Sequence, residues 1–235
     1  MENEMQFTTC AAMFERNQME LKQSSYDLLS QYADRLIQES EKQNVTAVRM
    51  LPEIWSRHFL DSAYLLPYIQ SGKVLDLGTG GGIPAIPLAI LNPNLEITML
   101  DSELRKIEFC KETISELGIS ADAVCGRAEE LARESAYEAQ FDYVVSRAMA
   151  SGSMLTELAV RFLRVGGRLL AMKGRQYDPA LERFREAASA LGCTVVDEIS
   201  YQLENEQKYL IVLQKDTETP AQYPRRFAKI KRNPL

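Results

Sequence analysis

Seven short apolar stretches that alternate with helical patterns predict an α/β fold, a doubly wound and mostly parallel seven-stranded sheet. A glycine cluster directly follows the first of these stretches, and a mostly helical segment precedes it. We therefore divide the chain of 235 residues into three parts. They are an N-terminal helical cap at 1–72, a sheet domain at 73–219 and a basic C-terminal tail at 220–235.

Helical spacing dominates the first third of the chain. Apolar residues recur mostly at intervals of three, four or seven over 11–42, which predicts a helix. A further helix is predicted over 52–68, because Pro52 stands near its start, where proline is well tolerated. Gly72 then ends the cap.

The following residues alternate between strand and helix patterns. The expected strands are 73–77, 96–100, 122–125, 141–146, 168–172, 194–201 and 208–214. The helices expected between the first six strands are 83–91, 103–117, 128–135, 153–163 and 178–191. Strands separated by helices indicate a parallel sheet that is covered on both faces. The last two strands have no helix between them, so we expect a hairpin with one antiparallel strand.

The first strand runs into the glycine cluster, which reads Gly78-Thr79-Gly80-Gly81-Gly82. Glycines in such a turn let the backbone approach a nucleotide-like ligand closely. A dinucleotide fingerprint would have its third glycine where this chain has Ile83. The difference favours S-adenosylmethionine, which carries no phosphate, over a pyrophosphate. The glycines that we expect to contact this cofactor are Gly78, Gly80 and Gly82.

Two acids accompany this loop. Asp101 follows the second strand, 23 residues after Gly78, at an edge where doubly wound sheets bind their ligands. We expect its carboxylate to accept hydrogen bonds from a ribose diol. Asp76 lies inside the first strand, two residues before the loop. It either holds the amino group of the cofactor's methionine or orients the glycine loop.

Later strand ends add further polar groups at the same edge. Ala128 and Glu129 follow the third strand and are expected at the adenine, although an ordinary helix start is the alternative. Arg147 leaves the buried strand at 141–146, which costs free energy unless the charge is paired or faces a pocket. We therefore expect Arg147 in the site. Lys173 follows the fifth strand and lies either at the same opening or in a solvated loop.

Composition excludes several classes of protein. The chain is 46% hydrophobic and 26% charged, which suits a folded core, and no apolar run approaches the roughly 20 residues of a membrane span. The N-terminus carries Glu2 and Glu4 and shows no secretory signal. Four separated cysteines and one histidine leave little material for a zinc site. We therefore expect a reduced, cytoplasmic, metal-free protein. A monomer is also expected, although the sequence leaves the oligomeric state open.

The charge is unevenly distributed. The net charge of -6 argues against a nucleic-acid partner, but removing the five basic residues of the tail leaves -11 on residues 1–219. A basic tail on an acidic body is typical of a local RNA-binding surface, and a solvated tail is the alternative. We expect deletion of the tail to weaken RNA binding and to leave cofactor binding largely intact. The basic residues are Arg225, Arg226, Lys229, Lys231 and Arg232.

In their order along the chain, these motifs resemble the RsmG (GidB) family of bacterial 16S ribosomal RNA methyltransferases. The similarity extends from about Leu28 to the end of the chain. The tail departs from the family pattern at Phe227-Ala228-Lys229, where members often carry a glycine. The matching segments are His58–Ser62, Leu75–Pro84, Leu100–Ser102, Arg105–Lys106, Arg127–Glu129, Ser146–Ala148, Met172–Gly174 and Tyr223–Arg226.

This resemblance implies a class I S-adenosylmethionine-dependent methyltransferase with a Rossmann-like domain. Its reaction would be methylation of N7 of a guanosine in the decoding-region loop of 16S ribosomal RNA, either free or in the small ribosomal subunit. Since guanine N7 carries an unprotonated lone pair, no general base is expected, and Arg147 would act by positioning. The implied cofactor contacts are Gly78, Ile83, Asp101, Ala128, Glu129 and Arg147. The expected RNA contacts are His58, Lys173, Arg225, Arg226 and Lys229.

Three other interpretations remain open on the sequence. One is a methyltransferase for a different RNA, a small molecule or a protein, against which the basic tail argues mildly. Another is a nicotinamide-dependent oxidoreductase, which Ile83 disfavours. The third is a non-catalytic RNA-binding module, because a fold alone does not establish catalysis.

Overall fold

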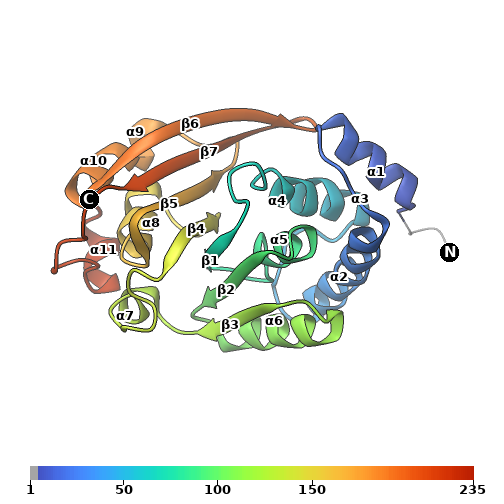
Figure 1. Cartoon of the computed structure of the whole chain (residues 1–235), viewed down its shortest axis with the longest axis horizontal. Coiled ribbons are helices and arrows are strands. Elements are labelled where there is room, and N and C mark those ends of the chain that lie inside the picture. Colours follow the sequence, from blue (N-terminus) through green and yellow to red (C-terminus); the bar gives the residue numbers. More distant parts are fainter. Residues whose placement is uncertain (1–4) are drawn as a thin grey trace.

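The computed structural model describes residues 5–235, and residues 1–4, with the two acids noted above, lie outside that range. A seven-stranded sheet in the order β3-β2-β1-β4-β5-β7-β6 forms its centre (Figure 1). Strand β7 is antiparallel to both of its neighbours, and the other neighbouring pairs are parallel. The predicted fold class is therefore confirmed. The strands are β1 (Gly72–Leu77), β2 (Leu95–Asp101), β3 (Ala121–Cys125), β4 (Phe141–Arg147), β5 (Leu163–Lys173), β6 (Cys193–Leu203) and β7 (Glu206–Lys215).

The strands lie where the apolar runs predict them, because a sheet covered on both faces requires apolar residues at successive positions. In β1, Val74 packs into the core on one face of the sheet and Leu75 into the core on the other. The expected hairpin is β6–β7. Strand β5 begins at Leu163, five residues before its expected start, and includes Gly166 and Gly167.

The helices differ more from the predictions. The helix expected over 11–42 is two helices, separated near Gln18, whose φ of 60° is left-handed and interrupts an α-helix. The helix expected over 52–68 contains a π-helical turn, η1, between two short α-helical pieces. The helices are α1 (Phe7–Arg16), α2 (Gln23–Lys42), α3 (Leu51–Ile54), η1 (Trp55–Leu60), α4 (Asp61–Ala63), α5 (Ala85–Leu91), α6 (Leu104–Leu117), α7 (Ala128–Leu131), α8 (Gly152–Ala159), α9 (Pro179–Glu182), α10 (Phe184–Ala190) and α11 (Phe227–Arg232).

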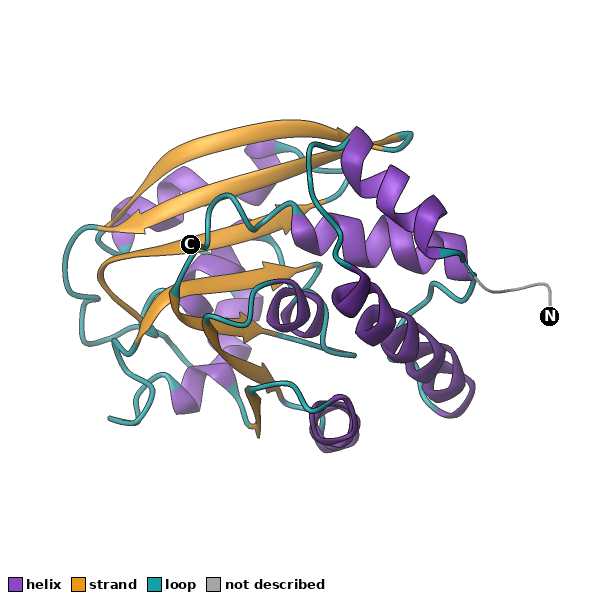
Figure 2. Cartoon of the chain, turned by 45° about the vertical axis from the view of Figure 1, so that its right-hand side comes forward, coloured by secondary structure: helices purple, strands orange, loops and turns teal. Residues whose placement is uncertain are grey.

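Helices cover both faces of the sheet, as Figure 2 shows. Helices α5 and α6 pack on one face, where α2 and α4 cover α5 in turn, and α8 and α10 pack on the other face. The N-terminal helices share a single hydrophobic core with the sheet, because Phe14, Tyr32 and Phe59 belong to the same buried cluster as Val74. Tyr32 of α2 stacks on Phe59 of η1 with ring centroids 5.6 Å apart, which packs η1 against this face.

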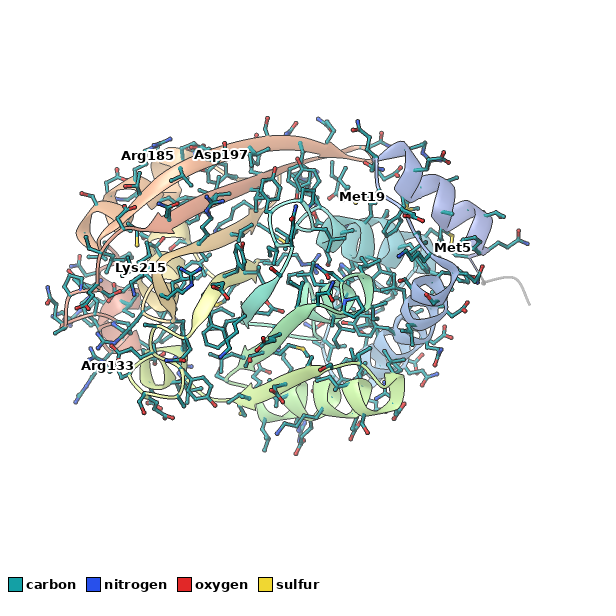
Figure 3. All side chains as sticks on the ribbon, viewed as in Figure 1. Met5, Met19, Arg133, Arg185, Asp197 and Lys215 are labelled. Atoms are coloured by element: carbon teal, nitrogen blue, oxygen red, sulfur yellow. The ribbon has the colours of Figure 1, made fainter. Side chains whose placement is uncertain are left out.

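The last sixteen residues, 220–235, form an ordered segment that we call the C-terminal arm. Its Arg225 donates from Nε and Nη2 to the carboxylate of Glu157, at 2.8 and 2.5 Å, and Glu157 is fully buried in α8. Arg133 donates to the carbonyl of Pro224 at 2.8 Å, and Figure 3 places its side chain on the side where the arm lies. Ile230 is fully buried in the core beneath α8. These contacts make the arm an integral part of the fold.

The Arg225–Glu157 pair gives a direct test of this anchoring. We expect Arg225→Ala to lower the free energy of unfolding by about 3–5 kcal/mol, because it leaves a buried carboxylate without its counter-ion. The matched control is Arg226→Ala, which removes an exposed arginine next to it and should change stability by less than about 0.5 kcal/mol. Urea unfolding of the two variants provides the comparison. Equal effects on stability would show that the buried pair does not anchor the arm.

Candidate functional site

A cavity of about 350 Å³ opens at the carboxyl ends of β1, β2, β3 and β4. This is the edge at which doubly wound sheets bind ligands. The cavity brings together six of the expected cofactor-binding residues, and two others, Gly82 and Ile83, lie outside its lining. Ile83 is buried at 5% exposure, so its side chain belongs to the core. The six residues in the lining are Gly78, Gly80, Asp101, Ala128, Glu129 and Arg147.

The glycine loop needs glycine for two different reasons. Gly78 has a φ of +75°, and a Cβ there would lie 2.6 Å from Cγ of Met149. Gly80 has a φ of +58°, and a Cβ there would meet no atom within 4 Å. The backbone at Gly80 therefore faces open space in the cavity, as expected for a loop that supports a ligand closely.

Asp76 holds the glycine loop from beneath. The carboxylate is fully buried, and its Oδ2 accepts hydrogen bonds from the Thr79 hydroxyl at 2.6 Å and the Ala85 N–H at 3.3 Å. Burial raises the pKa of Asp76 to about 7, against the opposing effect of these two hydrogen bonds. Both contacts join parts of the turn that carries the loop. The contacts of Oδ2 fit orientation of the loop, and Oδ1, which is buried without a hydrogen-bond partner among residues 5–235, keeps capacity for the amino group of the cofactor.

Asp101 couples the loop to β2. Its Oδ2 accepts a hydrogen bond from the Gly80 N–H at 3.0 Å, and its Oδ1 accepts one from the Glu103 N–H at 3.0 Å. A carboxylate can accept about four hydrogen bonds, so both oxygens keep capacity for a ligand. Asp101 lines the cavity with its orientation already fixed.

Arg147 lies at the end of β4, with its side chain 22% exposed. Its Nη1 donates to the carbonyl of Arg57 at 2.9 Å and lies 3.1 Å from Nδ1 of His58 and 3.6 Å from Oδ2 of Asp61. Within residues 5–235, Nη1 makes every hydrogen bond of this guanidinium. Arg147 therefore has one nitrogen fixed by the N-terminal layer, which comprises the helices from α1 to α4, while its side chain lines the cavity.

Three of the five expected RNA contacts are held by other protein groups. His58 is buried at 4% exposure, and burial lowers its pKa to about 3. Lys173 donates from Nζ to the carbonyl of Ala150 and to the carboxylate of Glu182, each at 2.8 Å. Arg225 is paired with Glu157, as described above. Other groups of the protein thus hold the polar atoms of these three residues, and their contact with RNA stays a prediction.

Arg226 and Lys229 differ from those three residues. Both are exposed on the C-terminal arm. They lie in the lining of a second, more open cavity, which shares Glu129 and Phe227 with the first. These two cations are therefore available to a ligand beside the main cavity.

Sequence reasoning missed Phe227. This ring lines the main cavity, and the guanidinium of Arg127 lies over it, 4.4 Å from its centroid. The arm thus supplies part of the cavity wall, and the effect of removing the tail on cofactor binding stays a prediction. An aromatic residue among the tail's positive charges was the only sign of this in the sequence.

Comparison with known proteins identifies the family. A family model described as rRNA small subunit methyltransferase G (GidB) matches residues 25–210. The chain is 36% identical over 225 residues to ribosomal RNA small subunit methyltransferase G of Streptococcus gordonii, covering 92% of this chain and 94% of that protein. The protein of the same name from Desulfitobacterium hafniense is 37% identical over 224 residues, covering 94% of each chain.

The chain belongs to this family. The resemblance inferred from the motifs is thus confirmed, and the chain is an rRNA methyltransferase. Membership in this family disfavours the nicotinamide-dependent alternative.

Solved structures support the same fold. TrmN from Thermus thermophilus has a TM-score of 0.53 at 21% identity and covers 68% of this chain and 53% of its own. The PH0226 protein from Pyrococcus horikoshii has a TM-score of 0.54 at 16% identity and covers 75% of this chain and 96% of its own. The fold is that of class I methyltransferases.

Two further features bear on the site. In the part of the chain that the structure describes, no helix is long and apolar enough to cross a membrane. Across residues 5–235, no three His, Cys, Asp or Glu side chains are grouped so that they could hold a metal ion.

Proposed function

We propose that this chain transfers the methyl group of S-adenosylmethionine to N7 of a guanosine in 16S ribosomal RNA, with no general base. One observation carries the proposal. The guanidinium of Arg147, fixed at Nη1, lines the same cavity as the glycine loop and Asp101. The proposed site for the methyl donor and a cation that can contact the methyl-accepting base therefore lie in the same cavity.

The cavity residues fit the cofactor. A volume of about 350 Å³ lies in the range of small-molecule sites. The fixed carboxylate of Asp101 can accept the hydroxyls of a ribose, and Leu100 and Met149 offer apolar contacts for a ring. The open space over Gly80 suits the amino-acid end of the ligand, which carries no phosphate.

The chain's contribution to the reaction is positioning. When bound, S-adenosylmethionine supplies an electrophilic methyl group. Because guanine N7 has a free lone pair, no residue of the chain has to remove a proton. The remaining donors of Arg147 can contact the O6 edge of the base or the carboxylate of the cofactor. Phe227 of the arm supplies part of the cavity wall.

The exposed cations of the arm are the proposed RNA contacts. Arg226 and Lys229 lie in the lining of the cavity adjacent to the cofactor site, so phosphates held there would be close to the methyl donor. His58, Lys173 and Arg225 are left out of this RNA surface, because other groups of the protein hold their polar atoms.

Arg147→Lys tests the site. The substitution keeps the charge but removes the planar fork, so we expect about a 10²-fold lower rate of methyl transfer, in line with the cost of a misplaced group. Labelled methyl transfer to small-subunit RNA at saturating cofactor provides the measurement. Arg164→Lys is the matched control, since Arg164 is 55% exposed and pairs with Asp142 outside the cavity lining. Equal rates for the Arg147→Lys variant and the wild type would refute the assignment.

Arg226→Ala and Lys229→Ala test the RNA surface. Each should reduce the slope of log K for RNA binding against log salt by about 0.7–1, because each removes one phosphate contact. Binding of S-adenosylmethionine should not change. Arg16→Ala on α1, an exposed cation at the opposite side of the molecule from the arm (Figure 1), is the control. If the salt slopes of RNA binding for both variants equal the slope for Arg16→Ala, these two residues are excluded as phosphate contacts.

A further inference from the structure

The only histidine of the chain links the site to the N-terminal layer. His58 lies in η1, and its Nδ1 is 3.1 Å from Nη1 of Arg147. Its Nε2 is 2.7 Å from Oγ1 of Thr46, in the loop that precedes α3. The imidazole thus bridges Arg147 and a loop that does not itself reach the cavity lining.

The two contacts determine the tautomer of His58. A guanidinium has only donors, so Nδ1 has to be the unprotonated acceptor. The proton of the neutral ring then resides on Nε2, which donates to Oγ1 of Thr46. That oxygen also accepts the N–H of Val48 at 3.1 Å, which fixes it as the terminal acceptor. The order of donation therefore runs from Arg147 to His58 to Thr46.

The charges around His58 favour this neutral form. Burial is the largest contribution that lowers its pKa, followed by the positive charge of Arg147. A backbone hydrogen bond with Arg57 opposes them, and the charges of Arg57 and Lys208 lower the pKa more weakly. The carboxylate of Asp61 lies 3.6 Å from the same Arg147 nitrogen, and it accepts the hydroxyl of Tyr201 at 2.9 Å. The acid is thereby held by β6 and by the arginine.

These contacts show how Arg147 is held. The acceptors for Nη1 all come from one short stretch, the carbonyl of Arg57 and the side chains of His58 and Asp61. Two hydrogen bonds and an ion pair at Nη1 therefore limit the orientation of the guanidinium beside the cavity. A ring protonated at Nδ1 would present an N–H to Nη1 and release this restraint.

We propose that His58 is a positioning residue for methyl transfer, which acts through an acceptor Nδ1 that orients Arg147. This inference rests on the function proposed for Arg147 and adds a residue that does not touch the substrate. It also replaces the expected contact of His58 with RNA. The test has a spectroscopic part, which is independent of activity, and a kinetic part.

The spectroscopic part is nuclear magnetic resonance of the full chain labelled with 15N-histidine. Because the chain has one histidine, the spectrum contains the signals of only two ring nitrogens. We expect Nδ1 to resonate as an unprotonated nitrogen and Nε2 as a protonated one, without change from about pH 8 to about pH 5. In Arg147→Ala, the preference for this tautomer should weaken. A wild-type ring that is protonated at Nδ1, or that titrates near its usual pKa, would overturn the inference.

The kinetic part compares two amides at position 58. His58→Asn keeps an acceptor oxygen near the position of Nδ1, whereas His58→Gln places its amide near Nε2 and leaves Arg147 without this acceptor. We expect single-turnover methyl transfer within about threefold of wild type for Asn and about 10²-fold slower for Gln, as for a misplaced catalytic group. Cofactor affinity and thermal unfolding should match between the two variants.

The outcomes separate the two proposals. Equal transfer rates for the Asn and Gln variants, with Arg147→Lys about 10²-fold slower than wild type, would overturn the role of His58 and leave the proposed function intact. An Arg147→Lys variant as fast as wild type would refute the assignment of Arg147, whatever the variants at 58 do. A difference in thermal unfolding that parallels the rates would assign His58 a structural role only.

Discussion

The pairing of Arg147 at the end of β4 is the constraint on which the site depends. A cation that leaves a buried apolar strand costs free energy unless acceptors meet it. Here the acceptors come from η1 and α4, and aromatic rings of α2 pack against η1. The N-terminal helices therefore do more than cover apolar surface. They supply the groups that decide where this guanidinium lies.

On the cofactor side of the site, charged groups are likewise held by hydrogen bonds within the protein. Asp76 is fully buried, yet its accepted hydrogen bonds fix the turn that carries the glycine loop, and Asp101 fixes the amide of Gly80 from the neighbouring strand. Both acids act on the backbone before any ligand binds. Such preorganisation suits a reaction in which alignment and exclusion of water are the main requirements. The C-terminal arm completes the wall through Phe227.

The sequence predicts the sheet well because most strands are short apolar runs bounded by polar turns, and the cofactor loop is local in sequence. It predicts less where distant residues decide. The partners of Arg225 and Lys173 are Glu157 and Glu182, and no spacing rule connects the arm to α8 across 68 residues. The π-helical turn is likewise invisible to a helical periodicity. Lys173 and Arg225, which the sequence predicted as RNA contacts, are therefore paired with acids of the protein.

The most direct test of positioning without a general base is the pH dependence of the single-turnover methyl-transfer rate of the wild-type enzyme. Asp76 is the titratable group to exclude, because burial raises its pKa to about 7. With guanine N7 as the nucleophile and no proton to remove, the rate should stay constant from about pH 6 to about pH 8.5. A rate that rises about tenfold per pH unit up to a break near the pKa of Asp76 would contradict the account and identify a general base.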